Sequence, residues 1–295
     1  MATAAESISL RPSGRLRRRR MVNRLMEALG TLAALLAIAV LGIVVVSVAR
    51  KGAGALSWAF FTQTAVPFGQ PGGGLAHAMV GSALLVGLAI AMSLPVGILV
   101  SLYMTEFARP GTSAAVRTTL DVLNGLPSIV IGIFVYGLLV VGHTQSGLAG
   151  GFALAVIMLP LVARSTQEVL LLVPSTLREA GLALGASRWR TVLGVILPTA
   201  FGGILTGAVL ALARAAGETA PLLFTSSIFS DDHVTTDVTK ALPNLPVKIF
   251  FLSESPDPAD QQRAWAAALV LMSFVLLASI AGRAALARSR KKLGR

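Results

Sequence analysis

Six long apolar runs constrain this chain more than any other feature of its sequence. The runs lie near residues 28–48, 79–103, 122–141, 148–163, 191–213 and 264–286. A helix needs about 20 apolar residues to cross the hydrocarbon core of a bilayer, and every run except the short fourth one reaches that length. Charged residues make up only 13% of the chain, against about 25% in soluble domains. The sequence therefore predicts an all-α polytopic membrane protein with six transmembrane helices.

The positions of the basic residues predict the orientation of these helices. If the N-terminus is cytoplasmic, 19 of the 25 Lys and Arg residues fall on the cytoplasmic side, which is the bias found in membrane proteins. We therefore expect a basic cytoplasmic tail at 1–27, a six-helix transmembrane domain at 28–286 and a basic cytoplasmic C-terminus at 287–295. The net charge of +12 follows from this topology, so it indicates contact with the lipid bilayer and argues against a nucleic-acid partner.

The sequence contains no recognisable catalytic or metal-binding group. It has no cysteine, and its three histidines, His77, His143 and His233, do not have the spacing of metal ligands. It also lacks the G-x-x-x-x-G-K-[ST] phosphate-binding loop, so we do not expect the chain to bind ATP by that route. We predict a non-enzymatic membrane subunit that binds no cofactor or metal.

A polar segment at 179–198 separates the fourth apolar run from the fifth. Leu182, Ala186 and Trp189 are spaced i, i+4 and i+7, so on one helix they would share a face. Gly185 permits a bend or a close backbone approach. Arginines flank this face, at Arg178, Arg188 and Arg190. Taken alone, these residues are typical of a short amphipathic helix that lies among the lipid headgroups.

Arg214 and Glu218 are the only charged residues between Leu197 and Phe224. Because they are four positions apart, they would share one face of a helix. A charge at the centre of a span costs about 2.5–3.5 kcal/mol on insertion scales, and such residues usually mark a transport pathway. We favour a substrate pathway here. A structural ion pair, or two charges that reach the outer interface, are the alternatives.

The connection at 225–263 is acidic overall and rich in proline. Its composition is equally compatible with a docking surface for an extracytoplasmic binding protein and with a solvated connector. The prolines prevent it from forming one long helix. Its apolar stretch at 247–252 (VKIFFL) is expected to pack on the membrane or on a partner.

Several of these segments resemble the permeases of ABC importers. The segment at 179–198 is similar to the EAA loop of that family, with matches at Glu179, Ala180, Gly185, Leu197 and Pro198. Gly181 and Val195 stand where the family has Ala and Ile. Three further stretches narrow the resemblance to the A-type permease subunit of bacterial phosphate ABC importers: ARAAGETAPLLFT (213–225), LNGLPSIVIGIF (123–134) and GGGLAHAMVGSALLVGLA (72–89).

This resemblance implies an ABC importer type I permease fold in the bacterial cytoplasmic (inner) membrane and the import of inorganic phosphate. The implied partners are a homologous C-type permease, two copies of a cytoplasmic ABC ATPase that hold ATP and Mg, and an extracytoplasmic phosphate-binding protein. Arg214 and Glu218 would lie on the phosphate pathway. Arg164 is a weaker candidate, because a basic residue flanking the fourth span is an equally good reading. The loop that docks on the ATPase would use Glu179, Ala180, Gly181, Leu182, Gly185, Ala186 and Trp189.

The sequence is also compatible with other classes of protein. A permease for sulfate, molybdate or tungstate would share the EAA-like loop. A secondary transporter would need no ATPase, and inverted repeats would be its signature, but the sequence shows no such repeat. A membrane enzyme is the least favoured class, because reactive groups are lacking.

Overall fold

The computed structural model describes residues 14–66, 72–227 and 233–292. The described residues form helices and connecting loops without a strand, which confirms the all-α prediction. The helices are α1 (Gly14–Gly52), α2 (Trp58–Thr62), α3 (Ala76–Leu102), α4 (Pro110–Gly125), α5 (Ser128–Val135), α6 (Gly147–Leu171), α7 (Ser175–Ala183), α8 (Arg188–Thr191), α9 (Leu197–Ala216), α10 (Ala220–Thr225), α11 (Leu245–Glu254) and α12 (Pro258–Lys292). Short 3₁₀ or π turns follow some of them, namely η1 (Ala53–Ala55), η2 (Tyr103–Phe107), η3 (Tyr136–Val140) and η4 (Val192–Ile196).

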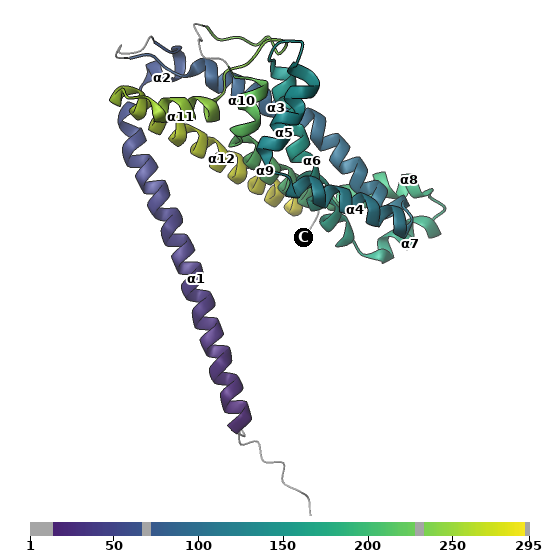
Figure 1. Ribbon diagram of the computed structural model, residues 1–295. Helices are drawn as coiled ribbons and strands as arrows, with labels where there is room; N and C mark the ends of the chain where they lie inside the picture. The colour runs from purple at the N-terminus through teal and green to yellow at the C-terminus, as the bar shows by residue number, and fades with distance from the viewer. Residues whose placement is uncertain (1–13, 67–71, 228–232, 293–295) are drawn as a thin grey trace, which may run out of the picture. The chain divides into compact units, whose positions relative to one another are not determined.

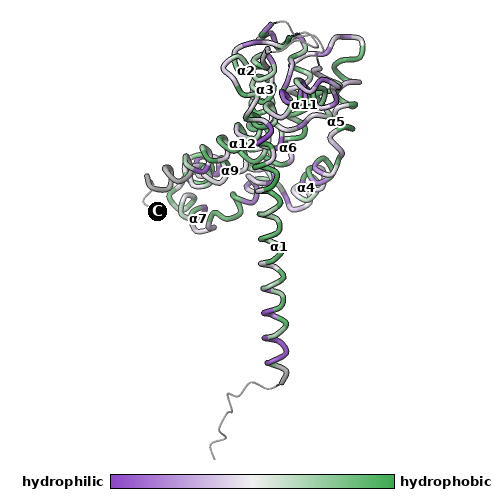
Figure 2. The backbone as a smooth tube through the Cα atoms, turned by 90° about the vertical axis from the view of Figure 1, so that its left-hand side faces the viewer, coloured by the Kyte–Doolittle hydropathy of each residue, from purple (hydrophilic) through white to green (hydrophobic). Residues whose placement is uncertain are grey.

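Five helical segments of the described chain are long and apolar enough to cross a membrane, and a bent pair of helices raises the number to six. The chain divides at Arg50 into two compact units. In the first unit, α1 is an uninterrupted helix whose start is hydrophilic and whose remainder is hydrophobic (Figure 2). The expected tail at 1–27 is therefore helical from Gly14 onward, and residues 1–13 lie outside the described residues.

The second unit is built around α6. Of the apolar windows in the spanning helices, that of α6 is 67% buried, whereas none of the others exceeds 28%. The most extensive helix pairing joins α6 to α3, and α9, α10, α4 and α5 also contact α6 (Figure 1). Its buried side chains include Leu154, Met158 and Val162, which pack with Leu85 of α3 and Ala211 of α9. α6 is thus the central helix of the bundle.

Glycines allow the neighbouring helices to approach α6 closely. A Cβ atom on Gly97 of α3 would lie 2.7 Å from Val162 Cγ1, and one on Gly203 of α9 would lie 2.5 Å from Val169 Cγ1. Small residues at helix crossings are the usual way to bring helix backbones together in a membrane. A buried hydrogen bond adds to this packing, because the Ser101 hydroxyl of α3 donates to the carbonyl of Ala163 at 2.5 Å.

The third predicted span, at 122–141, is not one straight helix. α4 ends at Gly125 and α5 begins at Ser128, with a 97° bend between the two helical segments. The cause is Pro127, because a residue that precedes proline is pushed out of the helical region, and Leu126 is indeed extended, with ψ 136°. The first residues of the predicted span therefore belong to the amphipathic helix α4.

The fourth predicted span, at 148–163, is too short. α6 continues to Leu171 through the polar sequence that follows Ala163. Thr166 and Gln167 are buried there against neighbouring helices. The polarity that ended the predicted span is therefore accommodated inside the bundle, and Arg164 lies within the helix instead of in a loop.

The described segment at 233–257, which precedes α12, packs on the chain itself. Asn244 caps α11 by accepting a hydrogen bond from the Val247 backbone N–H at 3.1 Å, and Pro246 occupies the first turn. Val247 is buried in the core that contains α6, and Leu245 is buried against α3 and α12. Val247 thus packs within the chain, whereas the packing of the rest of 247–252 on the membrane or on a partner stays a prediction.

The close contact between this segment and α3 gives a test of the fold. A Cβ atom on Gly81 would collide with the backbone carbonyl of Pro243, whereas one on Gly87, in the same helix, would meet nothing within 4 Å. We expect Gly81→Ala to destabilise the protein by about 1–3 kcal/mol, as overpacking does. Gly87→Ala should be neutral, or stabilise by up to about 1 kcal/mol through helix propensity.

Thermal unfolding of the two purified variants in detergent measures this difference. Equal unfolding temperatures for Gly81→Ala and Gly87→Ala would show that the segment at 233–257 does not rest on α3 as described.

Candidate functional site

The segment expected to form one amphipathic helix is a helix, a turn and a second helix. Leu182 lies on α7, Ala186 lies in the turn and Trp189 lies on α8. The prediction that these three residues share one helical face is therefore wrong. α7 and α8 lie at one end of the second unit (Figure 1), and α8 runs through the π turn η4 into α9.

Gly185 makes the turn between the two helices. Its φ is +79°, in the left-handed region that favours glycine. The Ala186 N–H donates to the carbonyl of Gly181 at 3.2 Å, and the Gly185 N–H donates to that of Leu182 at 2.9 Å. This pair of bonds is a Schellman motif, in which a glycine just beyond the helix reverses the chain. Ser187 then caps α8 by accepting a hydrogen bond from the Arg190 backbone N–H.

The departure from the EAA pattern at Gly181 has a structural reason. A Cβ atom at this position would lie 2.7 Å from Thr191 Cγ2 and 2.9 Å from Thr191 Oγ1. Thr191 is buried at the end of α8. Gly181 therefore allows α7 to pack directly on α8, where an alanine would displace the threonine.

The α7–α8 segment exposes both apolar and charged side chains. Leu184 is 89% exposed and Trp189 is 52% exposed. Glu179 and Ala180 are also exposed, and within the described part of the chain Glu179 forms no ion pair. Within the described residues, this short turn therefore presents a mixed apolar and charged surface.

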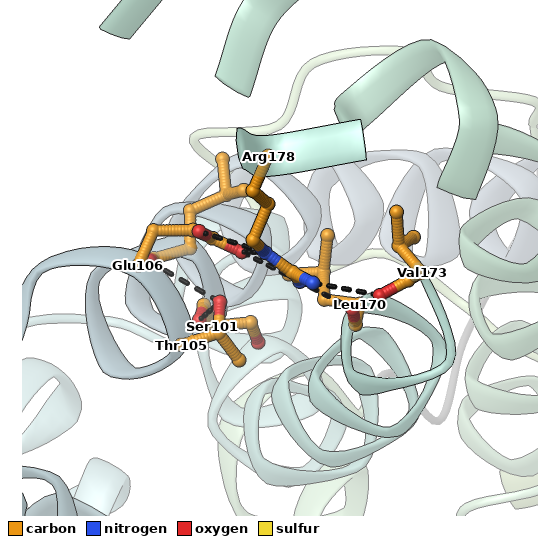
Figure 3. Close-up of polar contacts among 7 residues, drawn as sticks. Ser101, Thr105, Glu106, Leu170, Val173 and Arg178 are labelled. Carbon is orange, nitrogen blue, oxygen red and sulfur yellow. Dashed lines mark hydrogen bonds and ion pairs between the residues drawn. The ribbon is translucent and has the colours of Figure 1, made fainter. Parts of the chain in front are cut away.

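A partly buried ion pair that the sequence did not reveal holds α7 in place (Figure 3). Arg178 donates from Nε and Nη2 to Glu106 Oε1 at 3.0 and 2.9 Å, and from Nε to Oε2 at 3.2 Å. It also donates to the carbonyls of Val173 at 2.6 Å and Leu170 at 2.9 Å. In the sequence Arg178 stands out only as a flanking charge and Glu106 not at all, because 72 residues separate the two and no spacing rule connects them.

Arg214 and Glu218 come together where α9 ends. Arg214 occupies the last turn of α9, and Glu218 follows the end of that helix. Arg214 Nε lies 3.6 Å from Glu218 Oε1, and the two side chains are 50% and 17% exposed. This separation allows attraction between the charges but is too long for a hydrogen bond. The guanidinium therefore keeps its hydrogen-bond donors available.

The surroundings of this pair bring together the stretches that resemble phosphate permeases. α10 follows Glu218 directly and packs on α5, where Gly132 lies against Pro221. The rings of Tyr136 and Phe224 meet edge to face at 6.4 Å. At the other end of α10, the Gln145 amide donates to the Phe224 carbonyl at 3.1 Å. The segment that follows the Arg214–Glu218 pair is thus held firmly in place.

Arg164 lies elsewhere in the bundle. It forms an ion pair with Asp121 of α4, and both side chains are partly exposed. It does not pair with Glu218, so the structure does not join the three candidate pathway residues into one cluster. In the described residues, no group of acidic residues and histidines could hold a metal ion.

A helical bundle of this topology, with a helix–turn–helix segment exposed at one end, is typical of one class of transporter permease. Residues 93–291 match the family described as the binding-protein-dependent transport system inner membrane component. The fold is that of ABC importer type I permeases. It is shared with a bacterial alginate ABC transporter in complex with an alginate-bound periplasmic protein, at TM-score 0.63 and 14% identity over 91% of this chain and 96% of that chain. The inward-facing MetNI methionine ABC transporter has TM-score 0.57 and 19% identity over 73% and 94%. The chain belongs to this family and is a multi-pass protein of the inner membrane.

Curated relatives narrow the family further. The phosphate transport system permease protein PstA of Yersinia pestis is 44% identical over 246 residues, covering 83% of each chain. Its namesake in Xylella fastidiosa (strain Temecula1) is 40% identical over 277 residues, covering 93% of this chain and 96% of the relative. The PstA protein of Haemophilus influenzae is 40% identical over 261 residues, covering 88% and 91%. The chain is a PstA-like permease.

The turn at Gly185 yields a prediction about backbone conformation. A side chain there would meet no atom within 4 Å, so any effect of substitution comes from the backbone alone. We expect Gly185→Val to strain the turn by about 1–2 kcal/mol, the cost of a left-handed conformation in a residue with a Cβ atom. Gly185→Asn should cost less, because asparagine adopts this conformation more readily.

Hydrogen–deuterium exchange of the α7–α8 segment measures the effect. Exchange should be faster in the valine variant than in the asparagine variant. The same exchange rate in both would show that the left-handed turn is not maintained in solution.

Proposed function

We propose that this chain is a permease subunit of an ATP-driven importer of inorganic phosphate. The observation that carries the proposal is the 40–44% identity to phosphate transport system permeases over most of both chains. Family membership also favours an ATP-driven importer over a secondary transporter or a membrane enzyme. Sulfate, molybdate and tungstate remain the competing substrates, and direct uptake measurements separate them.

The Arg214–Glu218 pair supplies a mechanism for anion passage. Phosphate carries between one and two negative charges at neutral pH, and the half-exposed Arg214 guanidinium can give it charge-assisted hydrogen bonds. Glu218 pairs with Arg214 while the pathway is empty. When phosphate enters, Glu218 can accept a hydrogen bond from a protonated phosphate oxygen. Sulfate has no such proton at neutral pH, so the carboxylate would repel it.

The exposed α7–α8 segment supplies the coupling to ATP hydrolysis. In this proposal it docks on a cytoplasmic ATPase, which is present in two copies and holds ATP and Mg, and this chain binds no cofactor itself. A homologous C-type permease completes the pore, and an extracytoplasmic binding protein delivers phosphate to the opposite face. Both termini of this chain lie in the cytoplasm, in agreement with the distribution of its basic residues.

Uptake of labelled phosphate by cells that lack this chain tests the proposal. Return of the chain should restore phosphate uptake and leave the uptake of labelled sulfate and molybdate unchanged. Restored uptake of sulfate or molybdate instead would overturn the substrate assignment and keep the class of transporter.

The proposed role of Glu218 predicts a change in selectivity. Glu218→Gln removes the negative charge and keeps the size of the side chain, so phosphate uptake should fall by about tenfold, the value of one hydrogen bond to a charged group. Discrimination against sulfate should weaken at the same time. The matched control is Glu254→Gln, since Glu254 is exposed at the end of α11, and this variant should import normally. Unchanged phosphate uptake by Glu218→Gln would refute the role.

The proposed docking of α7 predicts an uncoupled variant. Glu179→Ala removes an exposed charge that has no ion-pair partner within the described residues, so the fold should be unaffected and the contact to the ATPase weakened. Phosphate uptake should fall by about tenfold, within the usual range of coupling energies, while ATP hydrolysis continues. Simultaneous assays of uptake and hydrolysis in proteoliposomes measure this, with Glu254→Ala as the control. If Glu179→Ala transports normally, the docking assignment is wrong.

A further inference from the structure

The side-chain contacts of the π turn η2 (Tyr103–Phe107) suggest how movement of the α7–α8 segment reaches the membrane helices. We propose that Glu106 and Arg178 are positioning residues that make α7 move together with the inner ends of α3 and α6. This inference rests on the proposed function, because it assumes that the α7–α8 segment is displaced by an ATPase. It adds the internal path by which that displacement acts.

The first contact is the Glu106–Arg178 ion pair. It joins η2, at the end of α3, to α7, and the same guanidinium donates to carbonyls at the end of α6 (Figure 3). The side chains are only 25% and 10% exposed. A forked arrangement of this kind fixes orientation as well as distance. Removal of one member would leave a partly buried charge without its partner, so the pair resists separation of the three helix ends.

The residue proposed for positioning, Arg178, and the residue proposed for docking, Glu179, are neighbours in the sequence. Arg178 points into the protein, whereas its neighbour Glu179 is exposed. A force applied to the exposed face of α7 at Glu179 therefore acts one residue away from the ion pair. No flexible linker lies between the two residues, because both belong to α7.

The second contact joins η2 to α8, the second helix of the α7–α8 segment. Phe107 of η2 and Trp189 of α8 stack with ring centroids 4.7 Å apart and an interplanar angle of 31°. Aromatic pairs at this distance attract each other beyond the burial of their area. The π turn η2 therefore contacts both helices of the docking segment, α7 and α8. α8 in turn continues through η4 into α9. A cleft of about 200 Å³ lies beside these contacts and is lined by Glu106 of η2, Leu182 of α7 and Arg188 of α8, so all three elements border the same space.

An apolar cluster beneath the ion pair keeps the fold independent of it. Leu102, Leu170, Val192 and Ile196 are buried together at this end of the bundle. Apolar contacts are not directional, so they hold the helices together without fixing the angle of α7. Loss of the ion pair should therefore impair the transmission of movement before it impairs folding.

Substitution of the pair tests this inference in the complete transporter, reconstituted in proteoliposomes. Glu106→Gln and Arg178→Lys should lower the amount of phosphate imported per ATP hydrolysed by about tenfold, within the range of measured coupling energies, while basal ATP hydrolysis and co-purification of the ATPase persist. The control is Asp237→Asn, which breaks an exposed pair with Lys240 and should leave the ratio unchanged. A normal ratio in a folded Glu106→Gln or Arg178→Lys variant would overturn the proposal.

A cross-link provides a second test that does not depend on the stability of a charge variant. The chain has no cysteine, so Phe107→Cys with Trp189→Cys can be joined by a short thiol-specific cross-linker. If η2 and α8 move as one body, cross-linking should leave transport at the level of the same double variant before the linker is added. Loss of transport that a reductant reverses, with a cleavable linker, would overturn the proposal.

These tests are separate from the test of the substrate. The ratio is measured with whichever of phosphate, sulfate and molybdate the unaltered transporter imports. A wrong substrate assignment would therefore appear in the unaltered protein, whereas a wrong positioning role would appear only in the variants.

Discussion

Close packing of α3 and α9 on α6 is the constraint on which the rest of this structure depends. Lipid tails are as apolar as leucine, so the burial of apolar area does little to drive helices together within a bilayer. Close contact between the helix backbones must hold the helices together instead. Gly97 and Gly203 permit that contact, and the hydroxyl of Ser101 adds a buried hydrogen bond to α6. With α6 fixed in this way, Leu170 at its C-terminal end and Val173 just beyond it offer carbonyls to Arg178, and α10 also packs on α6.

The sequence predicted the parts of the fold that depend on composition and missed the parts that depend on single backbone positions. Long apolar runs are visible in any window, so the spanning helices were found. The 97° bend between α4 and α5 depends on Pro127, and the apolar pattern runs through it without a break. The reversal after α7 depends on a left-handed Gly185, and the spacing of Leu182, Ala186 and Trp189 suggested one face only because it assumed an uninterrupted helix.

The same distinction applies to the candidate site. Arg214 and Glu218 were found because two charges in an apolar stretch are conspicuous and because they are neighbours in sequence. Glu106 was missed because its partner, Arg178, is distant in sequence and because a carboxylate at the end of a span is typical of any membrane protein. The ion pair between them is created by the packing of α3 against α6, and this packing cannot be read from the spacing of residues along the chain.

The two arginine–glutamate pairs of this chain show how geometry separates structural from functional charges. Arg178 uses its donors within the protein, on both oxygens of Glu106 and on two carbonyls, so a passing anion would have to break a partly buried forked contact in order to bind it. Arg214 is half exposed and meets Glu218 through one contact of 3.6 Å. A single long contact between partly exposed charges contributes little to stability, so an anion can replace it at small cost. The chemistry of the two pairs is the same, and their burial and number of contacts support the two proposed roles, positioning for the first pair and anion passage for the second.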